Sequence, residues 1–180
     1  MIGRVSAHST KSASILTVLN LKGGVGKTHT TWLLASVCQE RENRVLLIDL
    51  DTQGNLSDSF LEPTNHQPGV EQIFHPGNDT DITSLIRTTA FSHIDLIPCG
   101  PALAPLDLSN QTEWEKADLH LSLVETIAAL KDQYDYVVFD CPPRLSLVSF
   151  AALCASDGVV IPMEAADWGA QGIPHDHGRR

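Results

Sequence analysis

The stretch Lys22-Gly23-Gly24-Val25-Gly26-Lys27-Thr28 decides the fold of this 180-residue chain. An apolar run at residues 15–19 precedes it and predicts a strand, and an amphipathic segment at residues 27–40 predicts a helix. Glycines between a strand and a helix let the backbone approach an anion closely, and the first N–H groups of the helix converge on that anion. The stretch therefore predicts a phosphate-binding loop.

The loop departs from the common phosphate-loop pattern. That pattern, Gly-x-x-x-x-Gly-Lys-[Ser/Thr], requires a glycine where Leu21 stands, and a second lysine, Lys22, opens the loop here. This variant resembles the deviant Walker A ATPases, the group that includes ParA, Soj, MinD, the nitrogenase iron protein and the arsenite-pump ATPase. The resemblance covers residues 15–172 and implies a P-loop NTPase fold with ATP and Mg²⁺ as cofactors.

The resemblance implies a role for each residue of the loop. Lys27 would contact the β- and γ-phosphates, and Thr28 would coordinate Mg²⁺. Lys22 would be the signature lysine, which reaches the partner's nucleotide in a homodimer formed on ATP binding and acts there much as an arginine finger does. The remaining phosphate contacts would come from Gly23, Gly24, Val25, Gly26 and His29. His29 stands where the family usually has a second threonine, so a hydroxyl contact is lost.

A second motif follows the next predicted strand. Residues 47–55 read Leu-Ile-Asp-Leu-Asp-Thr-Gln-Gly-Asn and resemble the ParA motif usually written Asp-Pro-Gln-Gly-Asn. Asp51 matches the family carboxylate that positions the attacking water, and Asp49 would lie near the Mg²⁺ shell. Thr52 replaces the usual proline without removing a ligand.

A third motif resembles the Walker B stretch. Residues 134–143 read Tyr-Asp-Tyr-Val-Val-Phe-Asp-Cys-Pro-Pro, and Asp140 ends the apolar run. A carboxylate at the C-terminal end of a strand, in the crevice where nucleotides bind, can hold a Mg²⁺-bound water. We therefore expect Thr28, Asp49 and Asp140 at the metal, with Lys22, Lys27 and Asp51 as the catalytic residues.

Short apolar runs alternate with amphipathic stretches along the chain. This alternation predicts an α/β fold with a mainly parallel, twisted sheet and helices on both faces. Strands are expected at residues 15–19, 45–48, 94–98, 136–139 and 158–162, and helices at residues 27–40, 118–132 and 147–155. Prolines and glycines between residues 63 and 78 predict loops with short helices. In the first helix we expect Leu33, Leu34, Val37 and Cys38 to face the sheet.

Composition limits the classes of partner. The net charge of −10, without a basic cluster beyond Arg179-Arg180, does not predict DNA binding by this chain. The 4 widely spaced cysteines predict free thiols in a reducing compartment. No apolar run reaches the roughly 20 residues that span a bilayer, and the N-terminus lacks a secretory signal. We expect a cytoplasmic protein without a membrane partner.

The ends of the chain differ from the central domain. We expect a polar segment at residues 1–13, an ATPase domain at residues 14–172, and a disordered tail at residues 173–180. ParA-type proteins continue further, so the C-terminal part of the usual fold is expected to be missing. That part normally supplies adenine contacts, dimer surface and DNA-binding residues.

Three functions fit these motifs. The Gln53-Gly54-Asn55 and Cys141-Pro142-Pro143 details favour a small ParA, a slow Mg-ATPase that partitions plasmids or chromosomes with a separate ParB-like centromere-binding partner. The second hypothesis is a truncated, inactive remnant that binds nucleotide or partners weakly. The third is a MinD-like or other cargo-positioning ATPase.

Overall fold

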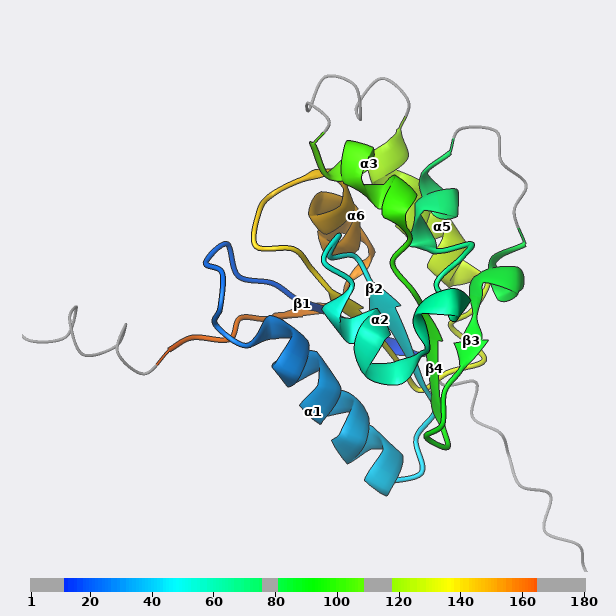
Figure 1. Ribbon diagram of the computed structural model, residues 1–180. Helices are drawn as coiled ribbons and strands as arrows, with labels where there is room; N and C mark the ends of the chain where they lie inside the picture. The colour runs from blue at the N-terminus through cyan, green and yellow to red at the C-terminus, as the bar shows by residue number, and fades with distance from the viewer. Residues whose placement is uncertain (1–11, 76–80, 109–117, 165–180) are drawn as a thin grey trace, which may run out of the picture.

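The computed structural model describes residues 12–75, 81–108 and 118–164 (Figure 1). The five strands and three helices that the sequence predicts occur in the expected order, and the described residues add one short strand and two short α-helices. In chain order they are β1 (Ser14–Val18), α1 (Lys27–Glu40), β2 (Val45–Asp49), α2 (Asn55–Phe60), β3 (Arg87–Thr88), β4 (Ile94–Ile97), α3 (Ala104–Leu108), α5 (Ser122–Ala128), β5 (Tyr136–Asp140), α6 (Leu147–Ala155) and β6 (Gly158–Val160). Short 3₁₀ helices occupy Pro63–Asn65, Val70–Phe74, Ile82–Leu85, Pro101–Leu103 and Leu119–Leu121. The α/β class is confirmed.

The strands form one sheet in the order β3-β4-β2-β5-β1-β6. All neighbours are parallel except β3, which runs antiparallel to β4. β5 lies between β1 and β2, so Asp140 has Val18 on one side and Asp49 on the other. This strand order brings the ends of all three motif strands to one edge, where α/β sheets bind ligands.

Helices cover both faces of the sheet, as predicted (Figure 1). Alternate side chains of the central strands point to opposite faces. On one face Val45 and Leu47 pack with Ala35 of α1 and Leu56 of α2. On the other face the side chains of β2, β4 and β5 pack with α5 and α6 in a larger cluster that includes Leu46, Ile48, Ile97, Phe139, Leu123, Ile127, Leu147 and Val148.

The buried stripe of α1 differs from our prediction. Leu34 and Cys38 pack against the core as expected, but Leu33 and Val37 are 46% and 45% exposed. The buried positions are Lys27, Thr31 and Ala35. They recur every four residues and therefore share one face of the helix. Thr31 must reach the end of β5 and Ala35 is small, so the contact face is set by the site and by close approach rather than by hydrophobicity.

Other boundaries also shift. The helix expected at residues 118–132 is a 3₁₀ turn, Leu119–Leu121, followed by α5, although Leu123, Ile127 and Leu130 are buried as predicted. β3 is only two residues long and has no periodic signal, so it was not predicted. Across the described residues, no helix has the length and apolarity to cross a bilayer. Residues 1–11 of the polar segment expected at 1–13, residues 165–172 of the expected domain and the tail expected at 173–180 lie outside the residues that the structure describes.

Candidate phosphate-binding site

The glycine loop joins the end of β1 to the start of α1. Gly24 and Gly26 have φ angles of 76° and 83°, in the left-handed region that favours glycine. Gly26 is the N-cap of α1, and no side chain caps the helix there. Nothing lies within 4 Å of the position that a Cβ would take at Gly23, Gly24 or Gly26. No side chain therefore caps the start of α1, and the glycines leave space beside the loop, both of which suit an anion site.

The two lysines of the loop lie differently. Lys27 is buried at the start of α1, and its Nζ donates to the carbonyl oxygen of Lys22 at 3.3 Å. The Nζ of Lys22 instead lies 2.9 Å from Oε2 of Glu164, after β6. Asn20 reinforces this connection, since its Nδ2 donates to the Pro162 carbonyl at 2.8 Å. Lys27 thus belongs to the loop interior, while Lys22 is turned toward the segment after β6.

Asp140 and Thr28 meet at the end of β5. Asp140 is 1% exposed, and its Oδ1 accepts a hydrogen bond from the Thr31 hydroxyl at 3.2 Å. The Thr28 side chain also hydrogen-bonds to Asp140. Within the described part of the chain, the buried Oδ2 of Asp140 has no hydrogen-bond partner. An unsatisfied buried carboxylate oxygen is costly, and oxygen ligands of this kind suit Mg²⁺. The donor set therefore fits a magnesium ion.

Asp49 is held by the protein itself. Its Oδ2 accepts from the Ser57 backbone at 2.8 Å and from the Ser57 hydroxyl at 2.7 Å, and its Oδ1 accepts from the Asp51 backbone at 3.1 Å. Oδ1 of Asp51 accepts from the Gln53 backbone at 3.0 Å. The second motif is thus a turn that Asp49 organises, with Asp51 beside the glycine loop. Ser57, which the sequence analysis missed, is the main partner of Asp49.

Burial controls the charge of these acids. It raises the pKa of Asp49 to about 7, with a further rise from the nearby charge of Asp140 and an opposing effect of the Ser57 hydrogen bonds. It also raises the pKa of Asp140 to about 6, against the hydrogen bonds from Thr28 and Thr31. Without a cation, these acids hold protons close to neutral pH. A bound cation would displace those protons.

One hollow of about 510 Å³ brings the motifs together. Its lining comes from the glycine loop, the second motif and the turn after β5. The lining residues are Gly23, Gly24, Gly26, Lys27, Thr28, His29, Asp51, Gln53, Asn55, Pro143 and Arg144. Arg144 was not among the predicted site residues. A basic residue directly after the Pro142-Pro143 pair could have indicated a phosphate contact.

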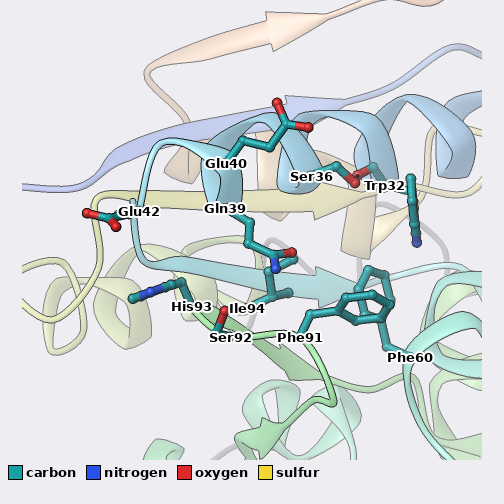
Figure 2. Close-up of a pocket in the computed structure, with 10 residues that line it drawn as sticks. All are labelled: Trp32, Ser36, Gln39, Glu40, Glu42, Phe60, Phe91, Ser92, His93 and Ile94. Carbon is teal, nitrogen blue, oxygen red and sulfur yellow. Dashed lines mark hydrogen bonds between the residues drawn. The ribbon is translucent and has the colours of Figure 1, made fainter.

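A second hollow lies between α1 and the loop before β4 (Figure 2). It measures about 490 Å³, and among its lining residues are Trp32, Gln39, Phe60 and Phe91. The rings of Phe60 and Phe91 meet edge to face with centroids 5.6 Å apart. None of the predicted site residues lines this hollow, so we assign the nucleotide chemistry to the first one.

Comparison with known proteins agrees with this geometry. A model of the AAA domain family matches residues 13–175. The chain belongs to this family. Its deviant loop and its relatives make it a ParA/MinD-type member, as the sequence predicts. The sporulation initiation inhibitor protein Soj of Bacillus subtilis is 34% identical over 160 residues, which are 88% of this chain and 61% of Soj. The chromosome partitioning protein ParA of Myxococcus xanthus is 34% identical over 163 residues, which are 88% of this chain and 55% of that protein.

Solved structures of related proteins contain nucleotides. The cobyrinic acid a,c-diamide synthase of Mycobacterium smegmatis with bound ADP and magnesium matches with a TM-score of 0.75 and 30% identity, over 84% of this chain and 60% of that one. A putative plasmid partition protein of Borrelia burgdorferi bound to AMPPNP matches with a TM-score of 0.74 and 31% identity, over 89% and 66%. This ParA/MinD-type chain thus spans about 60% of the length of several relatives.

Proposed function

We propose that this chain binds ATP with Mg²⁺ and hydrolyses it slowly, as a cytoplasmic ParA-type ATPase that serves plasmid or chromosome partitioning. One observation carries the proposal. The glycine loop, Lys27, Thr28 and Asp51 share a single hollow, and the unpartnered Oδ2 of Asp140 lies buried at the strand end beside them. This combination is suited to a triphosphate and its metal ion, and it extends the motif resemblance into three dimensions.

Each residue then has a defined task. The backbone of the loop and Lys27 bind the phosphates. Thr28 and Asp140 would hold Mg²⁺, with Asp49 near its shell, and the ion would neutralise phosphate charge. Asp51 accepts a hydrogen bond from the attacking water. The water oxygen forms a bond to the γ-phosphorus as the bond from that phosphorus to the β–γ bridging oxygen breaks, and ADP leaves with the bridging oxygen and that electron pair. The protons of the water pass to the phosphate products and solvent.

Lys22 has a further task in this proposal. We infer that it leaves Glu164 and reaches the nucleotide of a second copy when two chains dimerise on ATP. The Lys22–Glu164 pair is about half exposed, and pairs of this kind contribute little stability. A phosphate group can therefore replace Glu164 at small cost. The cargo partner would be a ParB-like protein, while the charge of −10 gives no support to direct DNA binding.

Hydrolysis of Mg-ATP by the purified chain tests this proposal. We expect turnover that falls by roughly tenfold or more in Asp51→Ala and in Lys22→Ala, since each removes a group acting near the transition state. Lys131→Ala removes an exposed lysine outside the site and should keep full activity. Measurements with and without double-stranded DNA show whether DNA affects the rate. A folded chain that binds nucleotide but turns over no faster than its variants would be a binding protein and not an ATPase.

A further inference from the structure

Arg144 lines the phosphate hollow but has no role in the function proposed so far. It lies in the turn between β5 and α6. Its carbonyl oxygen accepts a hydrogen bond from the Ser149 hydroxyl at 3.0 Å. The Ser149 hydroxyl also accepts from the N–H of Ser146, the N-cap of α6, at 2.8 Å. The backbone of Arg144 is therefore held by the helix that follows it.

A buried carboxylate also holds the side chain of Arg144. Its Nη1 lies 3.2 Å from Oδ2 of Asp107, in α3. The Asp107 side chain is 2% exposed, whereas the Arg144 side chain is 43% exposed. An unpaired buried carboxylate is destabilising, and the guanidinium of Arg144 neutralises the charge of Asp107. One edge of the guanidinium is thus anchored on Asp107, and Arg144 also lines the hollow.

The charges around the hollow leave room for a second cation. The residues that line the hollow include one lysine, Lys27, and one arginine, Arg144. Lys22 is paired with Glu164. A magnesium-bound triphosphate still carries excess negative charge. Lys27 approaches the hollow from α1, and Arg144 approaches from the turn after β5. Arginine presents several N–H donors in a fixed fork, a geometry that matches phosphate oxygens.

We propose that Arg144 binds the terminal phosphate of the nucleotide within its own chain and that Asp107 positions it. This inference rests on the proposed nucleotide site and adds to it a preference for one class of nucleotide over another. The site distinguishes a nucleoside triphosphate from a diphosphate through the Asp107–Arg144 pair. A purely structural pair would tie α3 to the turn after β5 and would affect all nucleotides equally.

The test compares the affinities of Mg-AMPPNP and Mg-ADP for the full chain by titration calorimetry. Arg144→Gln removes a charge-assisted contact, so we expect AMPPNP binding to weaken about tenfold or more and ADP binding to weaken less than about threefold. Arg144→Lys keeps a cation without the fork and should fall between Gln and the wild type. Arg41→Gln removes an exposed arginine at the end of α1 and should change neither affinity.

Asp107→Asn tests the positioning role. We expect part of the preference for AMPPNP over ADP to be lost, and this ratio is insensitive to a general loss of folded protein. An unchanged ratio in Asp107→Asn would overturn the positioning role. An unchanged ratio in both Arg144 variants, with the wild type binding nucleotide, would overturn the whole inference while leaving the nucleotide site intact. A wild-type chain that binds neither nucleotide would instead overturn the proposed function.

Discussion

Asp49 and Asp140, the two acids at the ends of β2 and β5, make the site responsive to protons. Both are buried, and burial raises the pKa of Asp49 to about 7 and that of Asp140 to about 6. Their ordinary value is 3.8. In the folded, cation-free chain both acids therefore hold protons well above the pH at which the unfolded chain releases them.

The stability of the cation-free chain should fall as pH rises. The folded state binds more protons than the unfolded state between about pH 4 and pH 7, so the stabilisation present at low pH is lost across that range. We expect a loss of about 2–5 kcal/mol, measured as the urea-unfolding free energy in chelator. Asp49→Asn should flatten the slope, whereas Glu40→Gln, an exposed acid on α1, should leave it unchanged. A wild-type stability that rises across this range would contradict the pKa shifts.

Side-chain identity predicted some contacts of the site and not others. The glycine loop and the acids of the second and third motifs were read from residue type and spacing, because phosphate and Mg²⁺ require those types. The partnership of Asp49 with Ser57 could not be read in this way, because a serine in a polar stretch has many possible partners. Arg144 was overlooked for the same reason, since its buried anchor Asp107 lies in a different element.

At the scale of elements, α1 depends on its glycine N-cap. Gly26 has a left-handed backbone with φ 83°, and nothing lies near the site of a Cβ. Gly23 also has open space around it, but its φ is not in the left-handed region. Substituting each glycine with alanine therefore tests the effect of backbone strain alone, because neither position has a steric clash.

Gly26→Ala should destabilise the chain by about 1–2 kcal/mol, because an alanine is strained in the left-handed region. Gly23→Ala should cost less than about 0.5 kcal/mol, since neither strain nor a clash opposes it. Urea unfolding of both variants in nucleotide-free buffer checks this difference. Equal losses in the two variants would show that the conformation of Gly26 is not the cause.

The same helix marks the limit of periodicity as a predictor. Residues 27–40 are helical as predicted. The amphipathic pattern of this segment, directly after the glycine loop, was sufficient to predict the helix. The prediction of its buried face was only partly correct. Leu33 and Val37 are exposed, while Thr31 and Ala35 are buried. A hydrophobic stripe identifies the core face only when packing alone orients the helix. Here Lys27 and Thr31 must also reach the site, and this requirement turns the helix.

At the scale of the whole molecule, one edge of the sheet is apolar. Among the described strands β6 pairs only with β1. Val159 of β6 is exposed, as are Ile161 and Met163 directly after it, and Leu21 is exposed at the glycine loop. An edge strand with unpaired backbone groups and apolar side chains is prone to association with other chains.

The isolated chain should therefore self-associate in a concentration-dependent way. Val159→Lys and Ile161→Lys add charge at the edge and should weaken this association several-fold, as charged edge residues do in natural sheets. Val124→Lys, at an exposed apolar position on α5, is the matched control and should have little effect. Sedimentation velocity over a range of concentrations provides the measurement. A wild-type chain that stays monomeric throughout would refute the prediction.

The sequence by itself determined the order of the longer strands and helices, the phosphate loop with its second lysine, and membership in the ParA/MinD-type family, but not β3, α2 or α3. These features depend on residue types at short spacing, which physical chemistry constrains locally. The tertiary structure alone decided that β5 lies between β1 and β2, that Asp140 adjoins both Asp49 and Thr28, and that Asp107 anchors Arg144. Those contacts join distant parts of the chain. Strand order and helix orientation bring them together through the packing of the whole core, which no local pattern encodes.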